Sequence, residues 1–196
     1  ANNVIAHVED LQDLMHGIQI LLDKNGVFIF EVPYLVDLIK KLEFDTIYHE
    51  HYSYLTAHSV DVVAKKCGLN LFRVERLLTH GGSNRYYLSK SKLPDETVVN
   101  VLTDEKNSGL FLEDKWKEFS AASEMAIEGL RQWFIDQKTA GNIVVGYGAA
   151  HKGNTFLNAV GEASKTLEYV VDASHEKQGK FLPGSQVPVL APEELN

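Results

Sequence analysis

Residues 44–56, with the sequence FDTIYHEHYSYLT, hold two histidines, a glutamate and three tyrosines. A buried strand or helix has little use for so many polar side chains, because each would need a hydrogen-bonding partner. A histidine titrates near neutral pH, a carboxylate can orient it, and a tyrosine can donate to an oxygen. The residue types therefore favour general acid–base chemistry, with a metal site or a solvated surface loop as the alternatives.

The metal alternative depends on His49 and His51, which form an H-x-H pair, and on His58 further along the chain. Such a pair can bind zinc from an extended segment. No carboxylate or third histidine stands at a closer matching spacing, so we predict no metal ligand in this chain.

A second candidate site is the glycine-rich stretch GYGAAHKG, residues 146–153. Gly146, Tyr147 and Gly148 would let the backbone approach a phosphate at the start of a helix, and Lys152 adds a positive charge. Asp172 follows the next apolar run, where a Rossmann-type fold often binds a ribose. The stretch departs from G-x-G-x-x-G at its third glycine, so NAD binding is poorly supported. The alternative is a purely structural turn.

The overall composition restricts the class of protein. The 196 residues are 44% hydrophobic and 23% charged, with a formal net charge of −8. The negative charge disfavours a nucleic-acid or anionic-membrane surface, and we see no apolar run long enough to span a membrane. The single cysteine, Cys67, excludes an internal disulfide and is expected to be packed in the core. We therefore predict a cytoplasmic protein.

The elements that must position these residues follow an α/β pattern. The first part of the chain predicts a helix at 9–22, a strand buried on both faces at 27–33 and a helical turn at 34–42. A second helix is expected at 58–68, with Ser59 as its N-cap. Two strands, at 69–78 and 83–91, follow it and are joined by THGG. This order predicts an antiparallel hairpin that closes an otherwise parallel sheet. His7 lies in the loop before the first helix, so its loop and the histidine-rich loop are expected to open at the same sheet edge.

A second α/β unit is expected after two linking helices. It contains a buried strand at 142–145, a helix from Asn154 and two further short strands within 167–195. We divide the chain into residues 1–92, linking helices at 93–140 and a Rossmann-like domain at 141–196. The candidate core contacts of the linking helices are Trp116, Phe119, Met125, Ile127, Leu130 and Phe134.

Six stretches together resemble a known family: ANNVIAHVED, VFIFEVPYL, FDTIYHEHYSYLT, THGGSNRYYLS, GYGAAHKGNT and VVDASHEKQGKFLPGSQVPVL. They occur in the order seen in S-adenosylmethionine (SAM)-dependent C-methyltransferases that act on nucleotide-linked keto-deoxysugars. The resemblance implies the end of a SAM-binding Rossmann domain followed by a domain that helps to hold a TDP-type nucleotide sugar. It also implies that a zinc-binding domain and the first part of the SAM domain precede this chain. We therefore expect the chain to be a fragment without methyltransferase activity of its own.

The resemblance also suggests catalytic roles. In that family, a base removes a proton next to a keto group, and the resulting enolate attacks the SAM methyl. His51 would be the base, oriented by Glu50. Tyr48 would share that role or hold the keto oxygen, and His7 would face the same pocket.

Binding roles follow in the same way. Asn2 and Asn3 would border the methionine end of SAM. Arg85 and Lys152 are the candidates for the diphosphate, with a surface arginine at a strand edge as the alternative for Arg85. Two other functional classes remain open: an NAD-dependent oxidoreductase, and a nucleotide-sugar-binding module without chemistry. The sugar, the methylated carbon and the oligomeric state are not specified.

Overall fold

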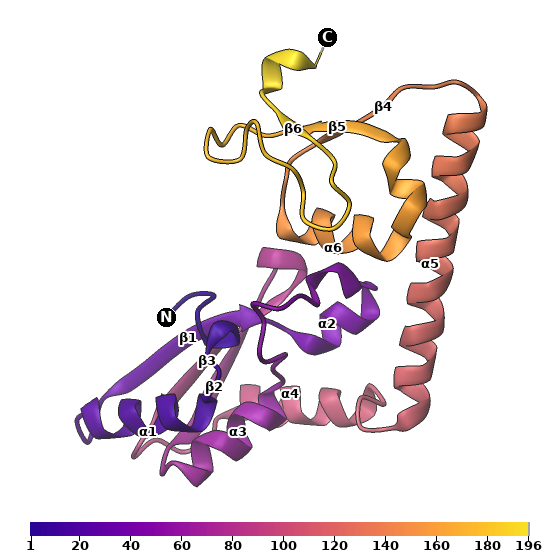
Figure 1. Cartoon of the computed structure of the whole chain (residues 1–196). Helices are drawn as coiled ribbons and strands as arrows, with labels where there is room; N and C mark the ends of the chain where they lie inside the picture. The colour runs from indigo at the N-terminus through magenta and orange to yellow at the C-terminus, as the bar shows by residue number, and fades with distance from the viewer. Residues whose placement is uncertain (196) are drawn as a thin grey trace. The chain divides into compact units, whose positions relative to one another are not determined.

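A computed structural model describes residues 1–195 as two compact units with the predicted α/β composition (Figure 1). Unit 1 comprises residues 1–43 and 49–119, and unit 2 comprises residues 44–48 and 120–196. Within the described residues, no helix is both long enough and apolar enough to cross a membrane. The three-part functional division at residues 92 and 140 stays a prediction.

Unit 1 contains a three-stranded sheet and the helices packed on it. In chain order its elements are η1 (Ile5–His7), α1 (Leu11–Leu21), β1 (Val27–Pro33), α2 (Leu35–Lys40), α3 (Ala57–Lys66), β2 (Asn70–Leu77), η3 (Thr79–Gly81), β3 (Ser83–Ser89) and α4 (Glu96–Asn107).

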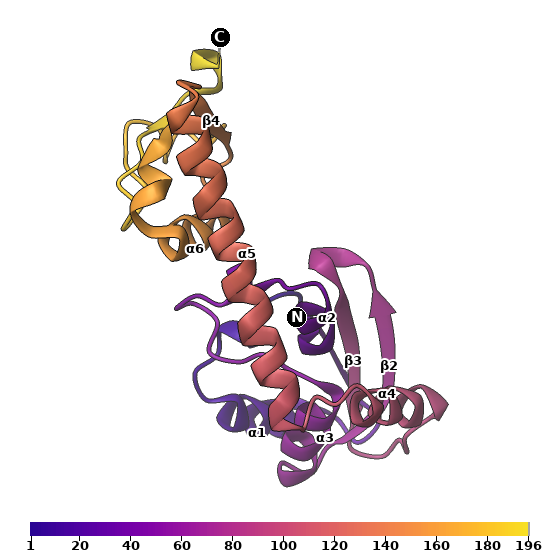
Figure 2. The same ribbon diagram turned by 90° about the vertical axis from the view of Figure 1, so that its right-hand side faces the viewer.

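The sheet has the order β1-β3-β2, and β3 is antiparallel to both neighbours. Figure 2 shows β2 and β3 as adjacent strands, which confirms the predicted hairpin. The connecting turn needs left-handed backbone at His80, Gly81 and Gly82 (φ 51°, 81° and 131°), a conformation that two glycines adopt without strain. At the free edge of β1, Asn2 pairs in parallel with Glu31.

The core of unit 1 lies on one face of this sheet. Phe30 and Val32 of β1 and Tyr86 and Leu88 of β3 are almost fully buried beneath the helices. The prediction that β1 is buried on both faces is wrong, because Ile29 on the opposite face is 41% exposed. A sheet covered on one face needs apolar side chains only at alternate positions.

The N-terminus of α3 is capped differently from the prediction. Thr56, not Ser59, is the N-cap. Its Oγ1 accepts from the Ser59 backbone N–H at 3.0 Å, and the Ser59 Oγ accepts in turn from the Thr56 backbone N–H. The fully buried carboxylate of Glu105 on α4 adds a second cap, accepting from the N–H groups of Ala57 (2.5 Å) and His58 (2.8 Å). The negative charge also suits the positive end of the α3 dipole.

Unit 2 contains a three-stranded parallel sheet of order β4-β5-β6, consistent with the predicted Rossmann-like unit. The predicted strand at 142–145 begins two residues later and is only partly buried, and the helix expected from Asn154 begins at His151. Its elements are η2 (Phe44–Thr46), β4 (Val144–Tyr147), α6 (His151–Val160), η4 (Gly161–Thr166), β5 (Leu167–Val171), β6 (Val189–Leu190) and η5 (Pro192–Glu194).

The long helix α5 (Glu113–Thr139) begins in unit 1 and ends in unit 2. Phe134 is buried in the core of unit 2, with Ile127 and Leu130 packed against that core, as predicted. The prediction that Met125 and Trp116 are core contacts is wrong, because these side chains are 70% and 42% exposed. An exposed apolar residue has the same helical spacing as a buried one, so periodicity does not separate them.

Candidate active site

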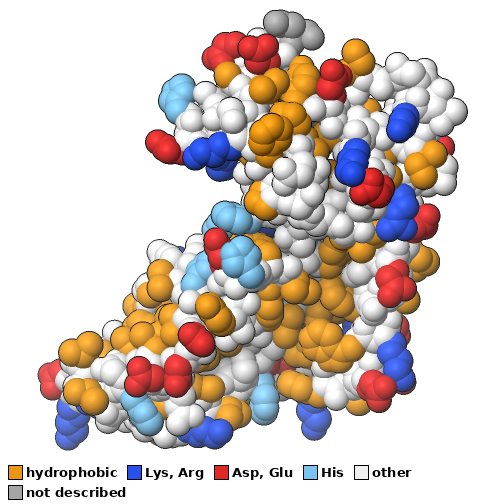
Figure 3. Space-filling view, in the orientation of Figure 1, with side chains coloured by type: hydrophobic (Ala, Val, Ile, Leu, Met, Phe, Trp, Pro, Cys, Tyr) orange, Lys and Arg blue, Asp and Glu red, His pale blue; other side chains and the backbone are white. Residues whose placement is uncertain are grey.

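Two histidines from separate segments meet in unit 1. The rings of His7 and His51 lie edge to face with 4.9 Å between their centroids, and the ring of Tyr54 lies 5.9 Å from that of His51. Histidine side chains at the surface of unit 1 are visible in Figure 3. The structure therefore brings His7 and the histidine-rich loop together, as the sequence predicted.

Backbone hydrogen bonds hold this loop against η1. The N–H groups of Tyr52 and Ser53 both donate to the carbonyl oxygen of Ala6, at 2.8 and 3.3 Å. Leu55 then forms a parallel bridge to Tyr34, the residue that follows β1. The cluster is thus fixed at the carboxyl end of β1, the edge at which α/β sheets bind ligands.

The contact between His7 and Glu50 determines the tautomer of one imidazole. The Nδ1 atom of His7 lies 2.9 Å from the backbone oxygen of Glu50. A carbonyl oxygen only accepts, so Nδ1 carries the proton, and Nε2 of neutral His7 keeps its lone pair. His7 can therefore accept a proton at Nε2 without losing its contact with the loop.

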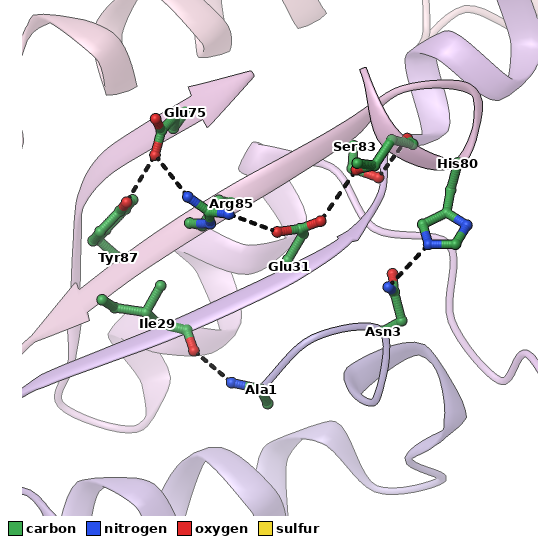
Figure 4. Close-up of polar contacts among 10 residues, drawn as sticks. Ala1, Asn3, Ile29, Glu31, Glu75, His80, Ser83, Arg85 and Tyr87 are labelled. Atoms are coloured by element: carbon green, nitrogen blue, oxygen red, sulfur yellow. Dashed lines mark hydrogen bonds and ion pairs between the residues drawn. The ribbon is translucent and has the colours of Figure 1, made fainter. Parts of the chain in front are cut away.

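The two asparagines expected near SAM lie beside the same strand. Asn3 has left-handed backbone (φ 54°), and its N–H donates to the Glu31 oxygen at 2.8 Å. Its Nδ2 donates to Nε2 of His80 at 3.2 Å (Figure 4), whereas its buried Oδ1 has no hydrogen-bond partner among the described residues. Asn2 is exposed next to it. The structure thus positions Asn3 firmly and leaves one amide atom unsatisfied.

Arg85 lies on the central strand β3 rather than at a strand edge. Its guanidinium pairs with Glu31 at 3.0 Å and with Glu75 at 3.3 Å, in a row across the sheet (Figure 4). The Tyr87 hydroxyl donates to Glu75 at 2.8 Å, and this bond, ahead of the Arg85 charge, lowers the pKa of the Glu75 carboxyl. Two carboxylates already balance the charge of Arg85, so its role as a diphosphate ligand stays a prediction.

In unit 2, two glycines of the turn, Gly146 within β4 and Gly148 just after it, meet a structural requirement. A Cβ at Gly146 would lie 2.8 Å from Cγ1 of Val170 on the paired strand, so close strand packing needs this glycine. Gly148 has φ 95° and donates its N–H to the Val171 oxygen at 2.7 Å. Tyr147 between them is 76% exposed.

The Asp172 side chain stabilises this turn through hydrogen bonds to residues around it. Its carboxylate accepts from the N–H groups of Ser174 (2.8 Å) and Ala149 (2.7 Å), and from Nζ of Lys177 (3.1 Å). These bonds, the backbone ones first, lower the pKa of the Asp172 carboxyl. Lys152, in the first turn of α6, has no hydrogen bond or ion pair with another described residue, and its role as a diphosphate ligand stays a prediction.

Tyr48 belongs to unit 2, where its ring stacks on that of His151 with 5.5 Å between centroids and an interplanar angle of 18°. His151, His80 and Tyr54 had no predicted role. His151 stands inside the glycine stretch and Tyr54 inside the histidine-rich loop, so their positions in those motifs were the available signal. Cys67 is buried as expected, and burial raises the pKa of its thiol.

Residues 78–196, more than half of the chain, match the family described as C-methyltransferase C-terminal domain. The chain is also 34% identical over 192 residues to the C-methyltransferase NovU of Streptomyces niveus. That alignment covers 96% of this chain and 46% of the relative, so the chain spans about half the length of the relative. This chain belongs to the C-methyltransferase C-terminal domain family.

Proposed function

We propose that this chain takes part in SAM-dependent C-methylation of a nucleotide-linked keto-deoxysugar. The observation that carries the proposal is the His7–His51 cluster, held by the Glu50 and Ala6 backbone at the carboxyl end of β1. A carbon next to a keto group is acidic enough to be deprotonated by a well-placed imidazole. The similarity to a C-methyltransferase supports transfer of a methyl group to a carbon atom.

In the proposed reaction His51 takes the proton, and the electron pair of the broken C–H bond delocalises onto the keto oxygen. Tyr48 shares the removal of the proton or donates a hydrogen bond to that oxygen, which stabilises its negative charge. Nε2 of His7 gives the pocket a second proton acceptor, and Glu50 orients His51 in this proposal.

SAM would supply the methyl group that the nucleophilic carbon receives. Asn3 fits a role at the SAM site, because its Oδ1 is buried and lacks a hydrogen-bond partner among the described residues. Its hydrogen bonds to Glu31 and His80 would hold the asparagine in place before SAM binds. Asn2 would lie beside it. Zinc would belong only to a part of the protein outside this chain.

For the nucleotide we propose the turn Gly146–Tyr147–Gly148, with Lys152 placed for a phosphate and a TDP-type nucleotide as the partner. The hydrogen bonds of Asp172 to Ala149, Ser174 and Lys177 occupy the carboxylate that an NAD-binding fold would offer to a ribose. This observation disfavours the oxidoreductase alternative. The buried, unpaired Cys67 suits a reducing compartment, and we propose the cytoplasm.

Deuterium exchange tests the proposal without SAM. The 196-residue chain is incubated in D2O with a TDP-linked keto-deoxysugar, and proton NMR follows exchange at the carbon next to the keto group. We expect exchange above the background rate, and a loss of about a hundredfold in His51→Asn, the size typical of a lost general base.

His49→Asn is the matched control, because His49 is an exposed neighbour in the same loop. Equal exchange rates in the wild-type and His51→Asn chains would contradict the role of His51. They would favour the binding module without chemistry if TDP still binds in calorimetry. Binding of NAD without TDP would favour the oxidoreductase.

A further inference from the structure

The histidine-rich loop is divided between the two compact units. Residues 44–48 belong to unit 2, and the chain rejoins unit 1 at His49. In unit 1, His51 lies against His7, and the backbone of the next two residues is bonded to Ala6. The predicted base and Tyr48 are thus only three positions apart but are held by different units.

The unit 2 part of the loop is attached to α6 through aromatic pairs. Phe44 lies 5.7 Å from Phe156, and Tyr48 stacks on His151 at 5.5 Å and 18° between ring planes. An offset, nearly parallel stack fixes both the position and the tilt of a ring. His151 is the first residue of α6, and the N-cap Ala150 makes no side-chain capping bond.

The backbone that carries His151 is itself braced. Ala149 donates its N–H to Asp172 at 2.7 Å and accepts from Nζ of Lys177 at 2.9 Å. The preceding Gly148 is bonded to the end of β5. These hydrogen bonds hold the backbone just before His151 in place, at the end of the turn that we assign to the nucleotide.

We propose that His151 is a positioning residue: its ring sets the orientation of the Tyr48 phenol, the group that in the proposed reaction shares the removal of the proton or donates to the keto oxygen. The proposal rests on the proposed function and adds a residue to it. His151 touches Tyr48 and not the reacting atoms.

The test uses the deuterium-exchange reaction of the 196-residue chain at saturating sugar, together with calorimetric titration of TDP. We expect His151→Ala to lower the saturated exchange rate about tenfold or more, because small errors in orientation are costly. TDP affinity should stay unchanged. His151→Phe keeps an aromatic ring at the same place and should restore most of the rate. His175→Ala, which removes another exposed histidine of unit 2, should leave both measurements unchanged.

Two results would overturn the proposal. An unchanged exchange rate in His151→Ala would show that Tyr48 needs no such support. A loss in His151→Phe as large as in His151→Ala, or weaker TDP binding in both, would assign the imidazole to direct contact with substrate.

A separate measurement distinguishes these results from failure of the proposed function. In proton NMR of the chain, the Tyr48 ring signals should shift in His151→Ala and much less in His151→Phe. If the wild-type chain catalyses no exchange, the proposed function fails. If the Tyr48 signals are also the same in His151→Ala, the positioning contact fails independently.

Discussion

The Nδ1 atom of His7 lies 2.9 Å from the backbone carbonyl oxygen of Glu50, 43 residues further along the chain. This hydrogen bond joins η1 to the histidine-rich loop and fixes the tautomer of His7. It is accompanied by the bonds from Tyr52 and Ser53 to Ala6, so the two segments form one local structure.

We therefore expect His7→Phe to lower the free energy of unfolding by about 0.5–1.5 kcal/mol, the usual net worth of one hydrogen bond. Amide hydrogen exchange of Tyr52 should also accelerate. His7→Asn is the matched control, because its Nδ2 can reach the Glu50 oxygen as Nδ1 does, and it should retain slow exchange at Tyr52. Equal amide exchange in His7→Phe and His7→Asn would show that this hydrogen bond does not hold the loop.

The buried Glu105 carboxylate is expected to be important for the stability of unit 1. Glu105→Ala leaves the N–H groups of Ala57 and His58 without their acceptor and should cost about 2–4 kcal/mol in urea-induced unfolding. Asp104→Ala, at the exposed neighbouring position on α4, should change stability by less than about 0.5 kcal/mol. Similar losses in the two variants would contradict the capping role.

The Asp172 carboxylate should make the free energy of unfolding depend on pH. Its pKa is lowered in the folded protein from the ordinary value of 3.8, so the folded state binds fewer protons near that pH than the unfolded state. The stabilisation is therefore complete above pH 3.8 and is lost as the pH falls through the lower folded-state pKa.

Urea unfolding at pH 7 and at decreasing acidic pH provides the measurement. The stability difference between the wild-type chain and Asp172→Asn should be largest near neutral pH and shrink in acid. Glu168→Gln, at an exposed position on β5, is the control that should not change this pH profile. A constant difference between wild type and Asp172→Asn would mean that the carboxylate charge does not stabilise the turn.

Gly146 is expected to be required for the packing of β4 against β5, whether or not it also contacts a nucleotide. Gly146→Ala brings a Cβ to 2.8 Å from Val170 and should cost about 1–3 kcal/mol in the free energy of unfolding. Gly153→Ala places its Cβ in open space on α6 and should stabilise by about 0.5–1 kcal/mol. Thermal unfolding of both variants checks the pair, and a neutral Gly146→Ala would show that β4 and β5 can move apart.

The sequence by itself determined most of the local structure. The apolar spacing and acidic first turn predicted α1, the apolar run predicted β1, and two strands around THGG predicted the β2–β3 hairpin. These signals come from neighbouring residues, so they are readable in one dimension. The crowding of histidine, glutamate and tyrosine likewise indicated a chemical loop before any fold was known.

Only the tertiary structure decided which partners those side chains meet. Arg85 pairs with Glu31, 54 positions away, because β1 and β3 align in one register, and no local pattern specifies that alignment. Tyr48 stacks on His151 and His51 lies against His7 because the histidine-rich loop packs on elements far from it in the sequence. Contacts between distant segments depend on how whole elements pack to bury their apolar faces, a property of the folded chain and not of any short stretch of it.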